Sequence, residues 1–305
     1  MTITDLPDTE IRPSAVRAIP VRRLDLDLGA IGSDRWIVDG DPIFSHFLAT
    51  LSAVFPNGED FFVTTVRQHR DAVPEGSILK RQVKGFIGQE AMHGREHRLV
   101  NASLDELGYG TDRAADGIGH LLERMLRMKP STLPLAVTAA AEHLTGTFAE
   151  AVLGDERTRR TLFAKPEIES LITWHALEEL EHKNVAFDVL ARADGRYVVR
   201  AGGMVVTLTV LGGYVGFSWV RALLGDRRHI TRASYRLHRR NLVRQRLLSF
   251  WALRKVLAYF RPGFHPDDMD TDALVVEWAE RLADQTMIIA TGEGDRQRGA
   301  GVTSA

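Results

Sequence analysis

The chain has 305 residues, 44% hydrophobic and 26% charged, a composition typical of a folded globular protein that excludes a disordered or fibrous one. Its 39 basic and 40 acidic residues give a net charge of −1, so we expect no nucleic-acid partner. The sequence contains no cysteine, which excludes disulfides, thiolate metal sites and a catalytic thiol and leaves His, Asp and Glu for metal chemistry. Residues 1–23 carry no apolar run of signal-peptide length, which predicts a cytoplasmic protein, at most peripheral to a membrane.

The spacing of apolar residues predicts an all-α protein with almost no strand. After a polar leader over residues 1–40, a first domain is expected at 41–195. Its predicted helices lie at about 42–55, 58–73, 76–107, 113–128, 132–153 and 166–193. Pro56, Asn57 and Gly58 are expected to separate the first two helices. Several of these segments are long enough to form a helical bundle.

A second region, 196–265, begins with an apolar run at 201–220 that lacks Asp, Glu, Lys, Arg and His and is long enough to cross a membrane. Its five glycines favour a helix buried in the protein or in a homodimer interface, which we prefer. The Arg-rich segment that follows is either a solvated helix or, together with the apolar run, a membrane contact through 201–246. The last region, 266–305, predicts an acidic helix at about 271–284 and a disordered Gly-rich tail.

Two of the long helical segments each contain a Glu-x-x-His step, and residues three apart share one face of a helix. One such pair on each of two helices, with one Glu from each of two more, builds the di-metal site of ferritin-like bundles. A buried carboxylate in the apolar stretch before residue 143 would need a cation as its partner. In chain order, the six candidate ligands are Glu59, Glu90, His93, Glu142, Glu179 and His182.

The last of these helices offers a third donor, because His175 stands four residues before Glu179. Random placement of the chain's His and Glu residues predicts only about 0.02 such His-x-x-x-Glu-x-x-His triples, so the pattern is informative. His97 is either an added ligand or a hydrogen-bond partner of a ligand, and we prefer the second. Glu178 also lies within one turn of His182, but Glu179 alone has the i, i+3 spacing of the first pair.

Carboxylate and imidazole donors without sulfur suit two iron ions, with manganese or zinc as alternatives. Four carboxylates balance the charge of two divalent ions and favour redox use. Small or short side chains near the ligand helices predict a cavity for dioxygen or a substrate, although close helix packing explains the glycines equally well. The cavity residues would be Gly88, Gly94, Thr145 and Gly146.

At these residues the sequence resembles the ferritin-like non-haem di-iron proteins, in particular the p-aminobenzoate N-oxygenase type, over about residues 40–193. That resemblance implies a seventh ligand at His175 and an amine or related nitrogen compound as substrate. The chain also looks like a bacterial group labelled predicted metal-dependent hydrolases, through its FPNGE, QE..H and WH..EE.EH blocks.

The leading hypothesis is therefore a di-iron oxygenase or oxidase that uses O2, a small organic substrate and an electron donor such as a ferredoxin or a flavin reductase. The alternative is a di-metal hydrolase that attacks an ester, amide or phosphate with a metal-bridging water. A third reading is a metal-storage or membrane-associated bundle without enzymatic activity.

Overall fold

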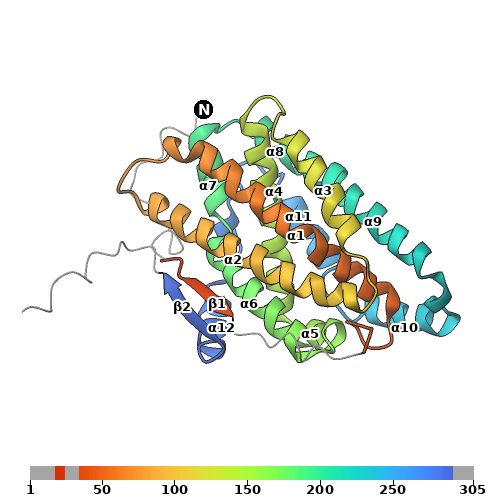
Figure 1. The fold of residues 1–305 in the computed structure, drawn as a ribbon. Coiled ribbons are helices and arrows are strands. Elements are labelled where there is room, and N and C mark those ends of the chain that lie inside the picture. The colour runs from red at the N-terminus through yellow and green to blue at the C-terminus, as the bar shows by residue number, and fades with distance from the viewer. Residues whose placement is uncertain (1–17, 25–33, 291–305) are drawn as a thin grey trace, which may run out of the picture.

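A bundle of long helices dominates the computed structural model, which describes residues 18–24 and 34–290 (Figure 1). Its centre is a ring of four helices, in which each helix contacts two of the other three. These helices are α1 (Pro42–His69), α2 (Ile78–Glu106), α4 (Thr132–Gly154) and α6 (Pro166–His182). The predicted all-α class is confirmed.

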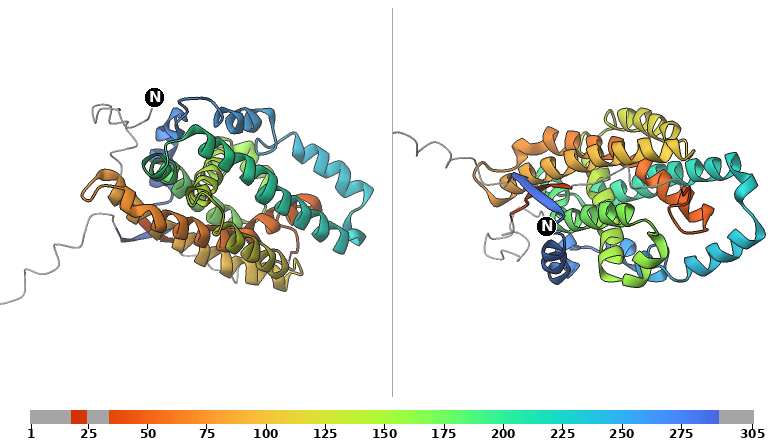
Figure 2. Two further views of the ribbon diagram at one scale, coloured as in Figure 1. Left: turned by 90° about the horizontal axis from the view of Figure 1, so that it is seen from above. Right: turned by 60° about the horizontal axis from the view of Figure 1, so that its bottom comes forward.

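The remaining elements cover this ring or follow it in the chain (Figure 2). The α-helices among them are α3 (Asp112–Met125), α5 (Glu156–Leu162), α7 (Val185–Ala193), α8 (Tyr197–Val206), α9 (Gly212–Gly225), α10 (Arg232–Leu242), α11 (Phe250–Ala258) and α12 (Asp272–Arg281). Short 3₁₀ or π turns are η4 (Arg70–Ala72), η5 (Thr207–Leu211), η6 (Arg227–His229) and η7 (Pro266–Asp268). The segment predicted as one helix over 166–193 is two, because α6 ends at His182 and α7 begins at Val185.

Helix α1 runs through the proline at which the sequence predicts a break, so that prediction is wrong. A proline inside a helix leaves the carbonyl four residues earlier without its N–H donor. Here the Asn101 side chain on α2 takes over, since its Nδ2 donates to the Ser52 carbonyl at 2.9 Å. Because α1 continues through Pro56, Glu59, one turn further on, lies inside the bundle.

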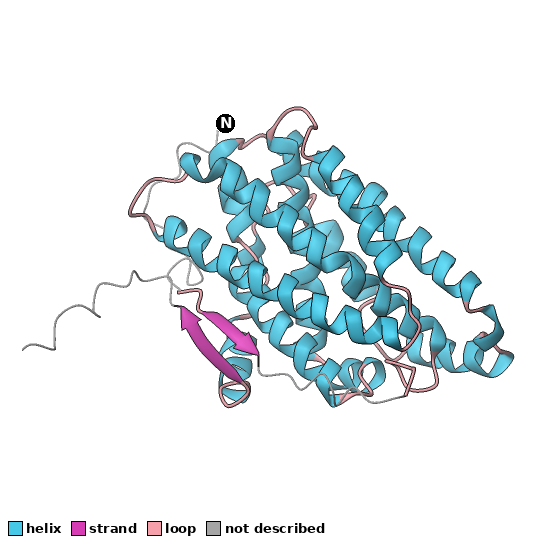
Figure 3. Cartoon of the chain, in the orientation of Figure 1, coloured by secondary structure: helices cyan, strands magenta, loops and turns pink. Residues whose placement is uncertain are grey.

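The expected polar leader contains a strand, β1 (Val21–Leu24), which pairs antiparallel with β2 (Thr286–Ala290) beside α2 (Figure 3). Glycines on α2 make this approach close: a Cβ at Gly88 would lie 2.4 Å from Val21 Cγ2, and one at Gly85 would lie 2.5 Å from Ile19 Cβ. Any larger residue there would push the strand away. The tail predicted to be disordered, from 292 onward, lies outside the described residues.

The apolar run at 201–220 forms α8, η5 and most of α9 on the outside of the bundle. Of its twenty residues only Gly203, Met204 and Thr207 are buried, so the chain itself does not cover this helix, and its burial in an interface stays a prediction. By length and composition, Tyr197–Gly225 is the one helix among the described residues that could cross a membrane. At the far end of this region, α10 is tied to the start of α1, because Asn241 Nδ2 donates to Asp41 at 3.0 Å.

Candidate metal centre

The ring of four helices brings the seven candidate ligands together in its interior. Each is at most 5% exposed. Helix α1 supplies Glu59, α2 supplies Glu90 and His93, α4 supplies Glu142, and α6 supplies His175, Glu179 and His182. Three of the groups whose ligand atoms lie within 4.8 Å of one another are Glu59, Glu90 and His93; His93, His175 and Glu179; and Glu90, Glu179 and His182. Glu142 joins them through its Oε2, which lies 3.3 Å from His182 Nε2.

Many of the oxygen and nitrogen atoms in this cluster that could bind a metal have no hydrogen-bond partner among the described residues. Neither carboxylate oxygen of Glu59 has a hydrogen-bond partner, and neither has His93 Nδ1. His182 Nε2 lies 3.1 Å from Glu90 Oε1 and 3.3 Å from Glu142 Oε2, but neither contact has hydrogen-bond geometry, so these atoms also lack a hydrogen bond. Buried polar atoms in proteins are almost always paired, since leaving one unpaired costs about 1–3 kcal/mol. A concentration of such atoms in one place fits cations as the missing partners, and the donor set suits two divalent ions.

The ionisation of the cluster points the same way. Burial, reinforced by neighbouring carboxylates, raises the pKa of Glu59 and of Glu90 well above its usual value and raises that of Glu142 to about 7. Burial lowers the pKa of His93, and the adjacent His175 lowers it further. Burial opposes the charge of Glu179 as well, but His182 and His175 outweigh it and hold the Glu179 pKa well below its usual value. Bound cations would relieve the repulsion among these carboxylates.

Behind His93, a charged pair fixes the orientation of the imidazole ring. Its Nε2 lies 3.1 Å from Glu178 Oε2, and Glu178 in turn accepts from Arg22 Nη1 of β1 at 3.3 Å. Burial and Glu181 raise the pKa of Glu178 to about 8, and Arg22 opposes this shift. When Glu178 is ionised it can only accept, so the imidazole proton is on Nε2 and the Nδ1 lone pair faces Glu90 and the rest of the cluster. Glu178 thus lies on the side of His93 away from the candidate ligand atom, consistent with a supporting role.

A second chain of hydrogen bonds holds His182. Its Nδ1 donates to Gln89 Oε1 at 2.8 Å, which leaves Nε2 toward Glu90 and Glu142. Gln89 Nε2 donates to Glu181 Oε2 at 2.8 Å. Arg22 closes the chain with two bonds of 2.7 Å to Glu181, the bidentate geometry that suits a guanidinium. One arginine from β1 therefore supports both Glu-x-x-His motifs.

The side chain of His97 contacts that of His175. Its Nε2 lies 2.8 Å from His175 Nδ1, and its Nδ1 lies 2.9 Å from Ser52 Oγ. The other nitrogen of His175, Nε2, lies 2.8 Å from Glu179 Oε1. Both nitrogens of His97 are thus engaged, although its ring is also close enough to Glu59 to share a cation with it. Whether it is a ligand stays a prediction.

The four residues expected to form a cavity make packing contacts or hydrogen bonds instead. Val21 fills the space above Gly88, so the expectation of open space there is wrong. A Cβ at Gly94 would lie 3.0 Å from Glu59 Oε2, so this glycine makes room for a candidate ligand. Thr145 Oγ1 donates to Glu179 Oε2. At Gly146 the nearest atom to an added Cβ is Lys183 Cβ at 3.6 Å, an ordinary packing contact.

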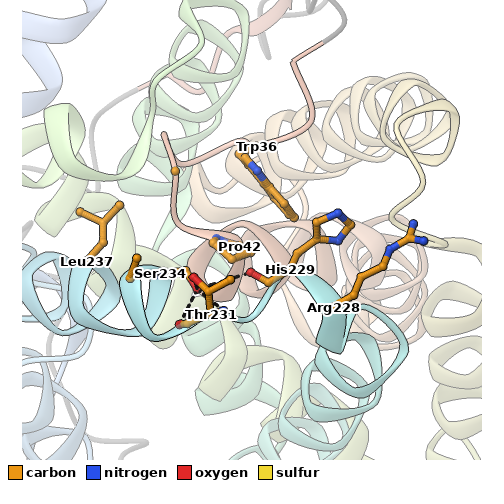
Figure 4. A pocket seen from close by; sticks show the side chains of 9 residues that line it. Trp36, Pro42, Arg228, His229, Thr231, Ser234 and Leu237 are labelled. Atoms are coloured by element: carbon orange, nitrogen blue, oxygen red, sulfur yellow. Dashed lines mark hydrogen bonds between the residues drawn. The ribbon is translucent and has the colours of Figure 1, made fainter.

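Two pockets stand out in the described part of the chain. The larger, about 340 Å³, lies at the start of α10 between Trp36, Arg228 and His229, and none of the seven candidate ligands lines it (Figure 4). The smaller, about 30 Å³, is lined by apolar side chains and by Ser52. It adjoins the cluster, since its Phe55 ring lies 4.7 Å from the His97 ring and 5.2 Å from the His175 ring, centroid to centroid.

The sequence analysis missed Arg22, Gln89 and Glu181. Arg22 lies in the segment read as a polar leader, and nothing in its neighbourhood marks it. A signal for the other two did exist: Gln89 precedes the first Glu-x-x-His step, and Glu181 lies among three acidic residues on the ligand helix. Three buried acids in one turn need a counter-charge, and β1 provides it.

An all-α ring around a buried cluster of Glu and His defines a metal-dependent helical-bundle protein. The family model described as predicted metal-dependent hydrolase matches residues 20–270, and the chain belongs to this family. The match spans Arg22 and all seven candidate ligands. Searches of curated proteins and of solved structures returned no match to the chain. Of the two resemblances seen in the sequence, the comparisons support the hydrolase group and not the N-oxygenase type.

Proposed function

We propose that the protein is a hydrolase whose activity depends on two metal ions held by Glu59, Glu90, His93, Glu142, His175, Glu179 and His182. The observation that supports a metal centre is a set of buried carboxylate and imidazole atoms without hydrogen bonds. These atoms face one another between α1, α2, α4 and α6. Membership of the predicted metal-dependent hydrolases supports hydrolysis as the reaction. This favours the alternative from the sequence analysis over its leading oxygenase hypothesis.

Divalent ions at this position would supply Lewis acidity and lower the pKa of a water molecule to near neutrality. The chain's own residues supply the orientation. Glu178 and Gln89 hold the His93 and His182 rings so that the unpaired nitrogens face the carboxylates. Thr145 fixes one oxygen of Glu179 by donating a hydrogen bond to it. Such supporting contacts commonly change metal affinity or activity 10–100-fold when they are removed.

The small pocket beside the cluster indicates a substrate class. Its lining contains no charged side chain, and Ser52 is the only polar one. The acyl or aryl part of a carboxylic ester or amide would find apolar contacts in such a lining, whereas a phosphate ester would have only the metal ions as partners. The pocket, at about 30 Å³, has only the volume of about one water molecule, so we favour a carboxylic ester or amide on the apolar character of its lining alone.

The test is hydrolysis of a series of aryl esters and anilides by protein that has been stripped with a chelator and reloaded with Fe(II), Mn(II) or Zn(II). We expect metal-dependent hydrolysis that is equally fast with and without O2. Glu90→Gln should lower kcat by at least tenfold, whereas Glu96→Gln, a change at another buried Glu of the same helix, should not. Hydrolysis that survives the chelator, or no hydrolysis with any metal, would contradict the proposal.

The donor set favours one second candidate, oxygen-dependent oxidation at a di-iron centre. Four buried carboxylates with three imidazoles and no sulfur suit iron as well as manganese or zinc. N-oxygenation of an amine rests on the sequence resemblance alone. Consumption of O2 by the iron-loaded protein in the presence of an amine, with no anaerobic hydrolysis, would favour this candidate over the first.

A further inference from the structure

The helix formed by α8, η5 and α9 presents an apolar stripe to the outside of the bundle. Phe217 is 63% exposed and Leu224 is 68% exposed. The other exposed large apolar side chains of this helix are Tyr197, Val198, Val205, Leu208, Val210 and Val220. Between 201 and 220 no Asp, Glu, Lys, Arg or His interrupts the stripe. So many exposed large apolar side chains on one helix are unusual on a soluble monomer and indicate an interaction site.

The opposite side of this helix is bound to the bundle along its length. Gly203 packs so closely on α4 that a Cβ there would lie 2.4 Å from the Ala136 carbonyl oxygen. Tyr214 Oη donates to the Ala114 carbonyl at 2.7 Å, and Trp219 Nε1 donates to the Ile43 carbonyl at 3.0 Å. A helix held in this way cannot cross a bilayer without losing these contacts, but it can lie on one.

The chain that follows carries a large positive charge. Residues 221–261 contain eleven Arg and one Lys against one acidic residue, Asp226, which gives a net charge of 12 − 1 = +11. The rest of the chain then carries −1 − 11 = −12. All eleven arginines are exposed, whereas Asp226 is buried and already bound by Arg35 at 2.7 Å. The charge of the protein is therefore strongly segregated.

The same basic region has exposed apolar side chains of its own. These are Tyr235, Val243, Leu248, Phe250, Leu253 and Leu257. In Figure 1, α10 lies at the end of the bundle at which α9 finishes, and α11 lies behind the middle of the bundle, where it contacts α4. Apolar side chains interspersed with arginines are the composition of segments that lie in the interface of an anionic membrane.

From these features we infer that residues 197–261 form a membrane-binding surface, which docks the protein in the plane of an anionic lipid bilayer. The apolar stripe enters the headgroup region, and the arginines bind lipid phosphates. A second copy of the chain is a poorer occupant, because a symmetric dimer through this surface would oppose two segments of charge +11. The proposal is independent of the reaction at the metal centre.

Co-sedimentation with vesicles tests the proposal on the full-length protein. We expect binding to vesicles of phosphatidylcholine with about 30% phosphatidylglycerol, little binding to phosphatidylcholine alone, and weakening as salt rises. Arg236→Gln/Arg239→Gln/Arg240→Gln on α10 should lower the partition coefficient about 100-fold, since each arginine near the surface contributes about 1 kcal/mol, which is about fivefold. The matched control, Arg67→Gln/Arg70→Gln/Arg81→Gln, changes three exposed arginines near the other end of α1 and should bind as the wild type does.

The apolar stripe has its own variant, Phe217→Ser/Leu224→Ser. Both side chains are largely exposed, so the thermal midpoint should not change, but vesicle binding should fall at least tenfold. Equal binding to neutral and anionic vesicles, or an unchanged partition coefficient in the α10 variant, would overturn the proposal. The proposal would also be overturned if the wild type did not bind vesicles but formed a dimer, and if Phe217→Ser/Leu224→Ser dissociated that dimer. A second copy of the chain would then cover the stripe.

Discussion

Replacing Glu59 by Gln should stabilise the metal-free protein, the reverse of what is usual for a buried charged residue. The Glu59 side chain is 2% exposed, and neither of its oxygens has a hydrogen-bond partner among the described residues. Burial and the nearby Glu179 raise its pKa, so its charge opposes folding. Gln has the same shape without the charge. If Glu59 serves only to bind a cation, removing its charge benefits the protein that lacks one.

The size of the effect follows from the burial of an unpaired group, about 1–3 kcal/mol. For a protein of this size that corresponds to a rise of about 2–10 °C in Tm. The pKa of Glu59 in the folded protein is raised above its value in the unfolded chain, about 4.5. The folded wild-type protein therefore loses stability as the pH rises above about 4.5, because the unfolded chain can ionise this carboxyl group more easily. The advantage of Glu59→Gln over the wild type should therefore grow between pH 5 and pH 8.

With metal added, the order should reverse, because the variant lacks one ligand and gains less from mass action. The assay is thermal unfolding of both proteins after chelation and after reloading, at several pH values. Glu150→Gln on α4 is the control, since Glu150 forms an ordinary ion pair with Lys255 at 2.9 Å. It should change stability by less than about 1 kcal/mol in either state. A metal-free Glu59→Gln protein that is less stable than the wild type would refute the reasoning.

Three further substitutions test the supporting contacts. Gln89→Ala removes the acceptor that orients His182 and should weaken metal binding about 10–100-fold in competition with a chelator; an unchanged affinity would contradict this role. Arg22→Met leaves two buried carboxylates without their counter-charge and should reduce the free energy of unfolding by about 3–5 kcal/mol in urea, whereas Arg23→Met, at the exposed neighbour, should have little effect. Asn101→Ala removes the donor that replaces the missing proline N–H in α1 and should lose about 1–3 kcal/mol; no loss would mean that water substitutes for the side chain.

The sequence predicted the helical bundle and the gathering of its candidate ligands because both depend on local spacing. Residues three or four apart on a helix share a face, so Glu90 and His93 had to point the same way. The apolar run around Glu142 likewise had to be buried, which made its carboxylate conspicuous. The participation of Glu59 depended on the order of helices typical of such bundles, and the structure places it with the rest.

What the sequence could not predict are the contacts between distant segments. Whether Pro56 breaks α1 depends on Asn101, 45 residues later, whose side chain satisfies the freed carbonyl. The role of Arg22 depends on β1 docking against α2, which the space above Gly88 permits. The exposure of the apolar helix depends on which elements cover it, and composition alone does not reveal that.

The most direct test of the account is the metal content of the protein after reloading and gel filtration, measured by inductively coupled plasma mass spectrometry. A centre built from seven donors on four helices predicts two metal ions per chain, falling to one or fewer in His175→Ala. Control Glu150→Gln should retain both. A wild-type protein that binds no metal, or a single ion that is unaffected by His175→Ala, would contradict the two-metal centre on which the proposed function rests.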